Sequence, residues 1–175
     1  QISAARVEGA TPGSQTLVFE PTDLKSGPYA FDIGTAGSTS LLLQTVWLPL
    51  SFAAGPSRLS LAGGTHVPWS PCVHYLQWQW LPYLAQIGYH VDCHLERAGF
   101  YPRGGGLLHA DIVPSRHLAP LQLTERGRLL RIRGLSAVGR LDRSIAERQR
   151  SQAVERLRDL GVPLEIEATE VPSVA

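Results

Sequence analysis

The sequence predicts an α/β fold, specifically an open sheet covered by helices on at least one face. Three observations predict it. Strand-like and helix-like segments alternate in the order β, α, β, α, β, β before residue 114. The composition suits a globular protein with many turns, with 43% hydrophobic and 18% charged residues, 17 glycines and 13 prolines. A short motif also occurs twice, which indicates internal duplication.

The first elements follow from apolar patterning and turn residues. Residues 17–19 and 29–33 have the pattern of two short strands, and the turn-rich segment between them predicts a hairpin. Ser38 or Thr39 can cap a helix over residues 39–54. A strand over 58–61, a helix over 73–87, and strands over 89–95 and 107–113 complete the first unit.

The duplication lies in the helices. Residues 43–49 (LQTVWLP) match residues 76–82 (LQWQWLP) at a spacing of 33 residues. Each copy precedes a glycine-containing loop and a strand, so 43–61 and 76–95 are predicted to be two copies of one helix-plus-strand unit. A proline inside a helix removes a hydrogen bond and costs ~3 kcal/mol. The two prolines therefore predict a matching kink in both helices.

The pattern of side chains changes from Leu118 onwards, and we divide the chain near residue 124 into domains 1–124 and 125–175. Residues 127–133 alternate apolar and basic side chains, which predicts a strand. A helix follows, with Asp142 and Ser144 as competing caps. Its predicted apolar face comprises Ala146, Ala153, Leu157 and Leu160. Gly161 and Pro163 end the helix before a strand over 164–169, so the second unit has the order β, α, β.

Arginine is concentrated in this second unit. The net charge is only +1, but ten of the fifteen arginines lie between residues 126 and 158. A guanidinium group suits phosphate better than an ammonium group does, which favours a polyanionic partner. The alternative is a solvated helix face with ion pairs such as Arg143 with Glu147, and the charge pattern leaves both open.

Composition also predicts the compartment and the state of the ends. No run of about 18 apolar residues occurs, so no membrane span is expected. Two cysteines, Cys72 and Cys93, fit reduced structural thiols in a cytoplasmic protein. The chain begins with Gln1, contains no methionine and stops after a strand-like run, so we expect both ends to be truncated.

Several loops and one helix residue are candidates for a binding site. Residues 34–38 form a strand-to-helix turn without the lysine of a phosphate-binding loop. Gln44 interrupts an apolar helix and must find partners or a ligand. Residues 63–75 hold the densest cluster of unusual side chains. The glycines at 104–106, beside Arg103, imply close approach of another backbone or of a polyanion.

The same segments contain no recognisable catalytic or metal motif. His66, Cys72, His74 and His94 are conceivable metal ligands, but their spacing matches no zinc pattern. No Ser/His/Asp or Cys/His triad is evident either, because such partners meet only in three dimensions. The sequence therefore predicts no catalytic residue and no metal ligand in this chain.

Three segments together resemble the RNA 3′-terminal phosphate cyclase family. They are residues 34–50 (GTAGSTSLLLQTVWLPL), 55–65 (GPSRLSLAGGT) and 97–106 (RAGFYPRGGG). The resemblance implies a large domain of repeated β-α-β-α-β-β units and a smaller inserted α/β domain, whose first half would be 125–175. It also implies ligase-type chemistry, in which ATP would adenylylate a histidine and AMP would pass to an RNA 3′-phosphate. The 2′-hydroxyl would then displace AMP to leave a 2′,3′-cyclic phosphate, with help from Mg²⁺ or Mn²⁺.

The resemblance assigns roles to individual residues. It implies that Gln44 contacts the nucleotide, that Pro71 lines the adenine pocket, and that residues of the GGT motif shape the cleft. These last residues are Gly63, Gly64 and Thr65. Arg103, Arg131 and Arg133 are the candidates for contacts with RNA or phosphate.

Departures from the family limit what carries over. His66 and His74 stand where acidic residues are common in the family. The family's nucleophilic histidine and a glycine-rich N-terminal segment lie outside this chain, so we expect a fragment that is inactive alone.

Two other functions compete with the cyclase. One is a non-catalytic cyclase-like scaffold that binds RNA or proteins, and the other is a relative of the enolpyruvyl transferases. Gln44 and Pro71 favour the enzyme lineage, and the phosphate-binding lysines and arginines of the transferases are not apparent. RNA 3′-phosphate ends are the expected partner, and an unpaired sheet edge predicts a homodimer.

Overall fold

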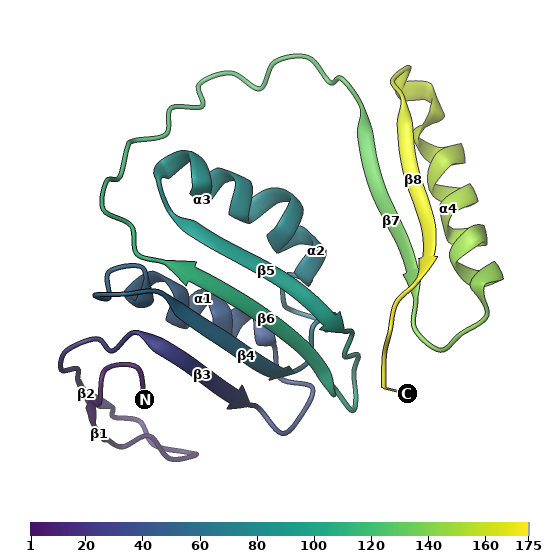
Figure 1. Cartoon of the computed structure of the whole chain (residues 1–175). Helices are drawn as coiled ribbons and strands as arrows, with labels where there is room; N and C mark the ends of the chain where they lie inside the picture. Colours follow the sequence, from purple (N-terminus) through teal and green to yellow (C-terminus); the bar gives the residue numbers. More distant parts are fainter. Residues whose placement is uncertain (175) are drawn as a thin grey trace.

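A computed structural model describes residues 1–174, and it contains a four-stranded sheet with β3 (Gly27–Asp32) and β4 (Ser57–Gly63) as parallel neighbours (Figure 1). β6 (Gly106–Val113) lies between β4 and β5 (His90–Arg97) and is antiparallel to both. The strand order is therefore β3-β4-β6-β5. This arrangement confirms the predicted mixed α/β class.

Helical connections join β3 to β4 and β4 to β5. α1 (Thr39–Leu50) leads from β3 to β4, and Ser38 caps it by accepting a hydrogen bond from the Leu41 N–H at 3.1 Å. The helix ends earlier than residue 54, because the N–H groups of Phe52 and Ala53 bond to carbonyls only three residues back. The second connection comprises α2 (Val73–Tyr75), the π-helical segment η1 (Leu76–Trp80) and α3 (Leu81–Ile87).

The two copies of the LQxxWLP motif pack into one core. Leu43 and Leu76 are fully buried at equivalent positions, and the rings of Trp47 and Trp80 meet edge to face at 5.2 Å. The prolines do not act alike, however. Pro49 lies in the last turn of α1, whereas Pro82 follows the π-helical segment, so the predicted matching kink is wrong. The two copies of the motif therefore share their packing but not their backbone geometry.

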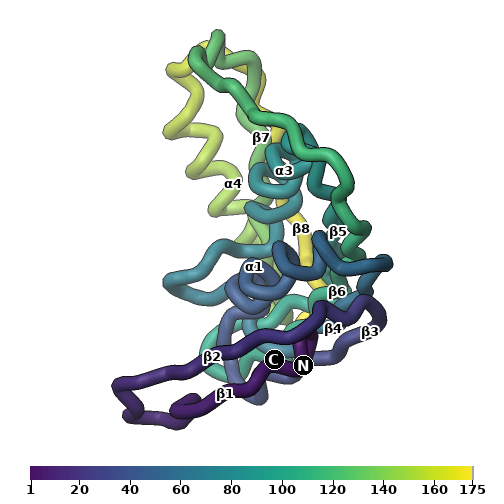
Figure 2. The backbone as a smooth tube through the Cα atoms, turned by 90° about the vertical axis from the view of Figure 1, so that its left-hand side faces the viewer, coloured from purple at the N-terminus to yellow at the C-terminus, as the bar shows by residue number. Residues whose placement is uncertain are grey.

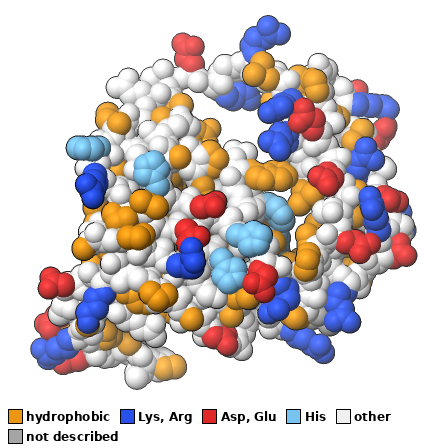
Figure 3. Space-filling view, viewed as in Figure 1, with side chains coloured by type: hydrophobic (Ala, Val, Ile, Leu, Met, Phe, Trp, Pro, Cys, Tyr) orange, Lys and Arg blue, Asp and Glu red, His pale blue; other side chains and the backbone are white. Residues whose placement is uncertain are grey.

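One face of the sheet is apolar and the other is polar. The core consists of buried side chains from the helices and from alternate positions of β4 and β6, including Leu43, Leu59, Leu61, Leu108 and Ile112. The opposite face carries an exposed ion pair between Arg58 and Asp111 at 2.7 Å. Figure 3 shows charged and histidine side chains among the residues that face the viewer. The sheet is therefore covered by helices on one face.

The N-terminal strands pair differently from the sequence prediction. β1 (Arg6–Glu8) pairs antiparallel with β2 (Val18–Glu20), and β3 pairs with β4. The predicted hairpin between residues 17–19 and 29–33 is therefore wrong. The segment between β2 and β3 instead lies against the N-terminus, because the N–H groups of Thr22 and Lys25 donate to the carbonyls of Ser3 and Ile2.

A further two-stranded sheet is a parallel pair of strands joined by a helix. β7 (Ile132–Val138) pairs with β8 (Leu164–Glu170) through α4 (Arg143–Leu157) and the 3-10 turn η2 (Arg158–Leu160). This confirms the predicted β, α, β order. The strand placed at residues 127–133 is wrong in position, since 114–131 contain no helix or strand and Leu130 is 77% exposed. Pairing starts only at Ile132, opposite Leu164.

The helix α4 begins and packs largely as its sequence predicts. Asp142 rather than Ser144 is the cap, because its carboxylate accepts the Ser144 N–H at 2.8 Å. Ala146 is fully buried, whereas Leu160 is exposed and does not belong to the apolar face. Gly161 adopts a left-handed conformation with φ of 65° and ends the helical segment.

The β7–β8 sheet is joined to the four-stranded sheet by a long segment that arches between β6 and β7 (Figures 1 and 2). The Ala98 N–H donates to the Pro172 carbonyl at 2.7 Å, which ties the end of β5 to the segment after β8. The domain division near residue 124 lies in the arching segment and stays a prediction. No helix within residues 1–174 is long and apolar enough to cross a membrane.

Candidate functional site

Loops from three strands meet backbone to backbone at one end of the four-stranded sheet. A Cβ atom on Gly64 would lie 2.4 Å from the Ala36 carbonyl oxygen, and one on Gly104 would lie 2.6 Å from that of Thr35. Gly104 also has a φ of +73°. The close approach predicted from the glycines at 104–106 is therefore an approach to the backbone of another loop of this chain. Gly63 likewise packs against the Gly37 carbonyl.

Thr65 fastens the loop after β4 to the end of β5. Its hydroxyl accepts the Gly99 N–H at 2.9 Å, and its own N–H donates to the Gly99 carbonyl at 2.9 Å. The side chain is fully buried, and its hydroxyl oxygen also lies 2.8 Å from Nδ1 of His66. Thr65 thus connects the glycine loops to a histidine.

His66 and His74 form a pair. Nε2 of His66 lies 3.0 Å from Nδ1 of His74, and the two rings pack against Phe100 and Trp78 respectively. Burial, with a smaller contribution from nearby His74, lowers the pKa of His66 to about 4. Burial also lowers the pKa of His74. Both rings are therefore neutral at pH 7. The sequence marks both residues as departures from the family, but it does not predict their contact.

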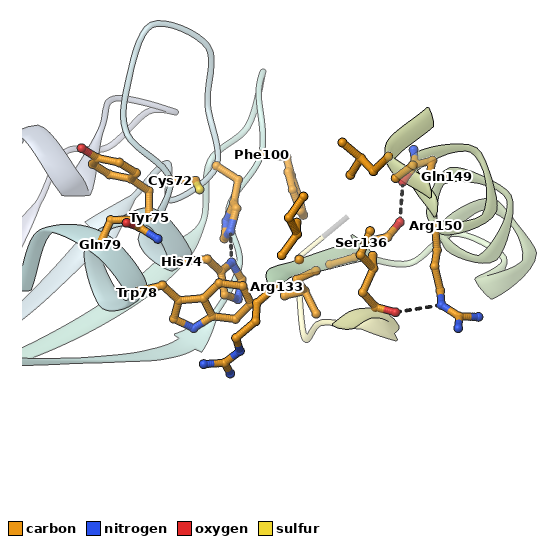
Figure 4. Close-up of a pocket in the computed structure, with 18 residues that line it drawn as sticks. Cys72, His74, Tyr75, Trp78, Gln79, Phe100, Arg133, Ser136, Gln149 and Arg150 are labelled. Carbon is orange, nitrogen blue, oxygen red and sulfur yellow. Dashed lines mark hydrogen bonds between the residues drawn. The ribbon is translucent and has the colours of Figure 1, made fainter. Parts of the chain in front are cut away.

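A cavity of about 670 Å³ opens beside this pair, between the α2–η1 segment with its neighbouring loops and the unit formed by β7, α4 and β8 (Figure 4). Its walls comprise aromatic and apolar side chains, two histidines, Arg133 and Arg150, and none of the 18 lining residues is an aspartate or glutamate. The guanidinium carbon of Arg133 lies 5.5 Å from the centre of the Trp78 ring. Such walls suit an anionic ligand with a planar or apolar part.

The residues predicted to bind the nucleotide lie outside this cavity. Gln44 is half-buried on α1, and its amide makes no hydrogen bond within residues 1–174, whereas Gln77, its counterpart in the repeat, donates to the Cys93 carbonyl at 2.8 Å. Pro71 follows Ser70, whose hydroxyl hydrogen-bonds with that of Ser38, the cap of α1. Gln44 and Pro71 thus lie on two segments that contact each other.

Of the three arginines predicted to contact RNA or phosphate, only Arg133 lines the cavity. Arg133 and Arg131 share Glu165, at 3.7 Å and 3.4 Å. Arg103 is exposed in the loop between β5 and β6, with no ion pair in the described part of the chain. Sequence reasoning missed Trp78, although an aromatic residue at the position that Thr45 occupies in the first copy was an available signal.

The conceivable metal ligands of the sequence are not gathered in one group in the described part of the chain. In residues 1–174 no group of three or more His, Cys, Asp or Glu side chains is placed to hold a metal ion. His66 and His74 are paired, whereas His94 lies on β5 opposite His109. The thiols are also free, and burial together with Asp92 raises the pKa of Cys93 to about 12.

The fold and the cavity define an α/β protein suited to an anionic, partly aromatic ligand. The family model for RNA 3′-terminal phosphate cyclase matches residues 1–162. This chain therefore belongs to the RNA 3′-terminal phosphate cyclase family.

Individual relatives agree with this assignment. The RNA 3′-terminal phosphate cyclase of Hyperthermus butylicus is 44% identical over 170 residues, which cover 95% of this chain and 47% of that protein. The cyclase of Pseudomonas fluorescens is 48% identical over 158 residues, which cover 90% and 46%. That of Methanopyrus kandleri is 43% identical over 173 residues, which cover 98% and 49%. The chain spans about half the length of these curated relatives.

Proposed function

We propose that this chain serves the ATP-dependent conversion of RNA 3′-phosphate ends into 2′,3′-cyclic phosphates. In the proposed reaction a histidine attacks the α-phosphorus of ATP and releases pyrophosphate. The RNA 3′-phosphate then takes AMP from that histidine, and the neighbouring 2′-hydroxyl attacks the activated phosphorus, loses its proton and expels AMP. Activation is needed because a phosphate oxygen is a poor leaving group without AMP attached. ATP with Mg²⁺ or Mn²⁺ is the proposed cofactor set.

The observation that carries this proposal is the similarity to proteins named RNA 3′-terminal phosphate cyclase, at 43–48% identity over 90–98% of the chain. The Gln44 amide is half-exposed and makes no hydrogen bond within residues 1–174, so it is available to a ligand, unlike that of Gln77, which donates to the Cys93 carbonyl. We therefore assign Gln44 to the nucleotide and Pro71 to the adenine pocket.

The basic segment is proposed to bind the RNA backbone. Ten arginines lie between residues 126 and 158, and Arg133 among them reaches the cavity. Arg103 and Arg131 are proposed to contact RNA phosphates outside it. These contacts position RNA without reading its sequence.

The chain alone is proposed to bind these ligands without catalysing the reaction. Its six histidines are His66, His74, His90, His94, His109 and His117. None of them occupies the family's nucleophile motif. The paired imidazoles at the acidic positions of the family favour a second candidate, a cyclase-like RNA-binding scaffold.

A chimera distinguishes the two candidates. In the P. fluorescens cyclase, the matching 158-residue segment is replaced by that of this chain, and the purified chimera is incubated with ATP, Mg²⁺ and a labelled RNA ending in a 3′-phosphate. We expect a 2′,3′-cyclic phosphate, and none from the same RNA ending in a 3′-hydroxyl. A chimera that is folded by circular dichroism and binds RNA but forms no cyclic phosphate would favour the scaffold. The Gln44→Ala chimera is expected to raise the KM for ATP.

A further inference from the structure

The hydrogen bonds around Thr65 favour one of two arrangements of the imidazole protons, because only one of them gives the buried Thr65 hydroxyl proton an acceptor. The Thr65 hydroxyl already accepts the Gly99 N–H at 2.9 Å, so its single proton is free to be donated to Nδ1 of His66 at 2.8 Å. Nδ1 is then an acceptor, and His66 carries its proton on Nε2. That proton is donated to Nδ1 of His74 at 3.0 Å. In this arrangement the neutral ring of His74 carries its own proton on Nε2, whereas in the reverse arrangement Nε2 of His74 is an acceptor.

This arrangement leaves one donor directed away from the chain of hydrogen bonds. Nε2 of His74 has no partner within residues 1–174. The half-buried ring lines the cavity and lies 5.8 Å from the Trp78 ring, centre to centre. Burial lowers the pKa of His74, so the ring remains a neutral donor at pH 7.

A cation lies on the same tryptophan. Arg133 packs over the Trp78 ring, and its ion pair with Glu165 is long, at 3.7 Å, and 59% exposed on the arginine side. Figure 4 shows His74, Trp78 and Arg133 together at one end of the cavity. The cavity wall supplies an imidazole and a guanidinium, and the nearest carboxylate to that guanidinium is Glu165, which does not line the cavity.

We propose that His74 Nε2–H and the Arg133 guanidinium bind a phosphate monoester in this cavity. Thr65 and His66 are positioning residues, because they hold His74 in the tautomer that donates from Nε2. The ligand is the terminal phosphate of a nucleotide or of an RNA strand. The inference deepens the proposed function and, for an RNA ligand, rests on it.

Nuclear magnetic resonance of the ¹⁵N-labelled chain tests the proton positions directly. Two-bond ¹H–¹⁵N spectra at pH 7 are expected to show the Nε2–H tautomer for both His66 and His74. Inorganic phosphate, AMP, a short RNA with a 3′-phosphate and the same RNA with a 3′-hydroxyl are then added separately. We expect the His74 resonances to shift with phosphate monoesters and not with the 3′-hydroxyl RNA. AMP and the phosphorylated RNA distinguish the two sources.

Variants separate the donor from its neighbours. His74→Phe keeps a ring against Trp78 but removes the donor, and is expected to weaken binding of the phosphorylated RNA at least about tenfold. His90→Phe, an exposed site on β5, is the matched control and is expected to bind as the unaltered chain does. His66→Phe is expected to give mixed tautomers at His74 and intermediate affinity.

The outcomes are distinct. An Nδ1–H tautomer at His74, or unaltered affinity in a folded His74→Phe variant, would overturn the proposed site. If that variant does not fold, the His74 shift in the unaltered chain decides the question. If the chimera cyclises RNA but no phosphate shifts the His74 resonances, only this site is refuted. Phosphate binding at His74 without cyclisation by the chimera refutes the proposed function alone.

Discussion

Replacing Thr65 with valine tests the junction that holds the functional loops together. The substitution exchanges a hydroxyl for a methyl group of similar size, so the shape of the side chain is nearly unchanged. It leaves the Gly99 N–H without its acceptor and Nδ1 of His66 without a donor. Thr65 is only 1% exposed, so water cannot easily replace either partner.

The magnitude follows from those two losses. A buried polar group left without a partner costs ~1–3 kcal/mol, and two such groups give a loss of roughly 2–4 kcal/mol in the free energy of unfolding after partial relaxation. Thr65→Ser is the matched control, because it keeps the hydroxyl and removes the methyl group that faces Gly106. Its expected cost is about 1 kcal/mol.

Urea unfolding followed by far-ultraviolet circular dichroism measures both variants against the unaltered chain. We expect the valine substitution to cost clearly more free energy of unfolding than the serine substitution, with an unchanged dependence on urea concentration. Valine within about 0.5 kcal/mol of the unaltered chain would show that the hydroxyl does not hold the loops. A serine variant as unstable as the valine variant would assign the effect to the methyl group instead.

Four further predictions concern pH, capping, assembly and RNA. The pKa of folded His66 is about 4, below its usual 6.5, so the free energy of unfolding is expected to fall as the pH drops from about 6.5 to about 4. In His66→Phe the urea midpoint should lose most of this dependence on pH. The pKa of Asp142 is lowered by its hydrogen bonds with Ser144, so Asp142→Ala should reduce the thermal midpoint at pH 7, and the difference should vanish once acid protonates the folded carboxylate. β3 and β5 are each paired on one side only within residues 1–174, and we expect self-association that light scattering detects; a monomer at every concentration would exclude it. Reversing the charges of Arg131 and Arg133 together should weaken RNA binding and reduce the salt slope by about 1 to 2, and unaltered binding would count against a role for this segment.

The sequence predicts the sheet and its helices because burial dictates their patterns. Alternation in β4 and β6 places apolar side chains such as Leu59 and Leu108 on the covered face, and the glycine and proline turns delimit the strands. The repeated motif also indicates real packing, as Trp47 and Trp80 touch. These features depend on local sequence and on a single apolar core.

Pairing partners and strand limits could not be predicted as well. β2 is three residues long and pairs with β1, which lacks a strong apolar pattern, so the choice between β1 and β3 depends on contacts far apart in the chain. Residues 127–131 have strand-like alternation but no partner, because β8 starts opposite Ile132. Propensity alone does not make a strand without a neighbour.

The candidate site was only partly accessible to sequence reasoning. Consecutive glycines signalled a close backbone approach, which Gly104 makes with Thr35. The contact between His66 and His74 depends on how the loop between them folds, and no spacing rule predicts it. The cavity also requires the β7–β8 sheet to lie beside Trp78, which is a long-range property of the fold.

Protein-bound AMP is the most direct measure of the proposed chemistry. The chain and the chimera with the P. fluorescens cyclase are incubated separately with ATP labelled at the α-phosphate and Mg²⁺, then separated by denaturing electrophoresis. We expect acid-labile label on the chimera, reduced by Gln44→Ala, and no label on the chain alone. Label on the chain alone would show that one of its own histidines is the nucleophile, and a folded, unlabelled chimera would contradict adenylylation.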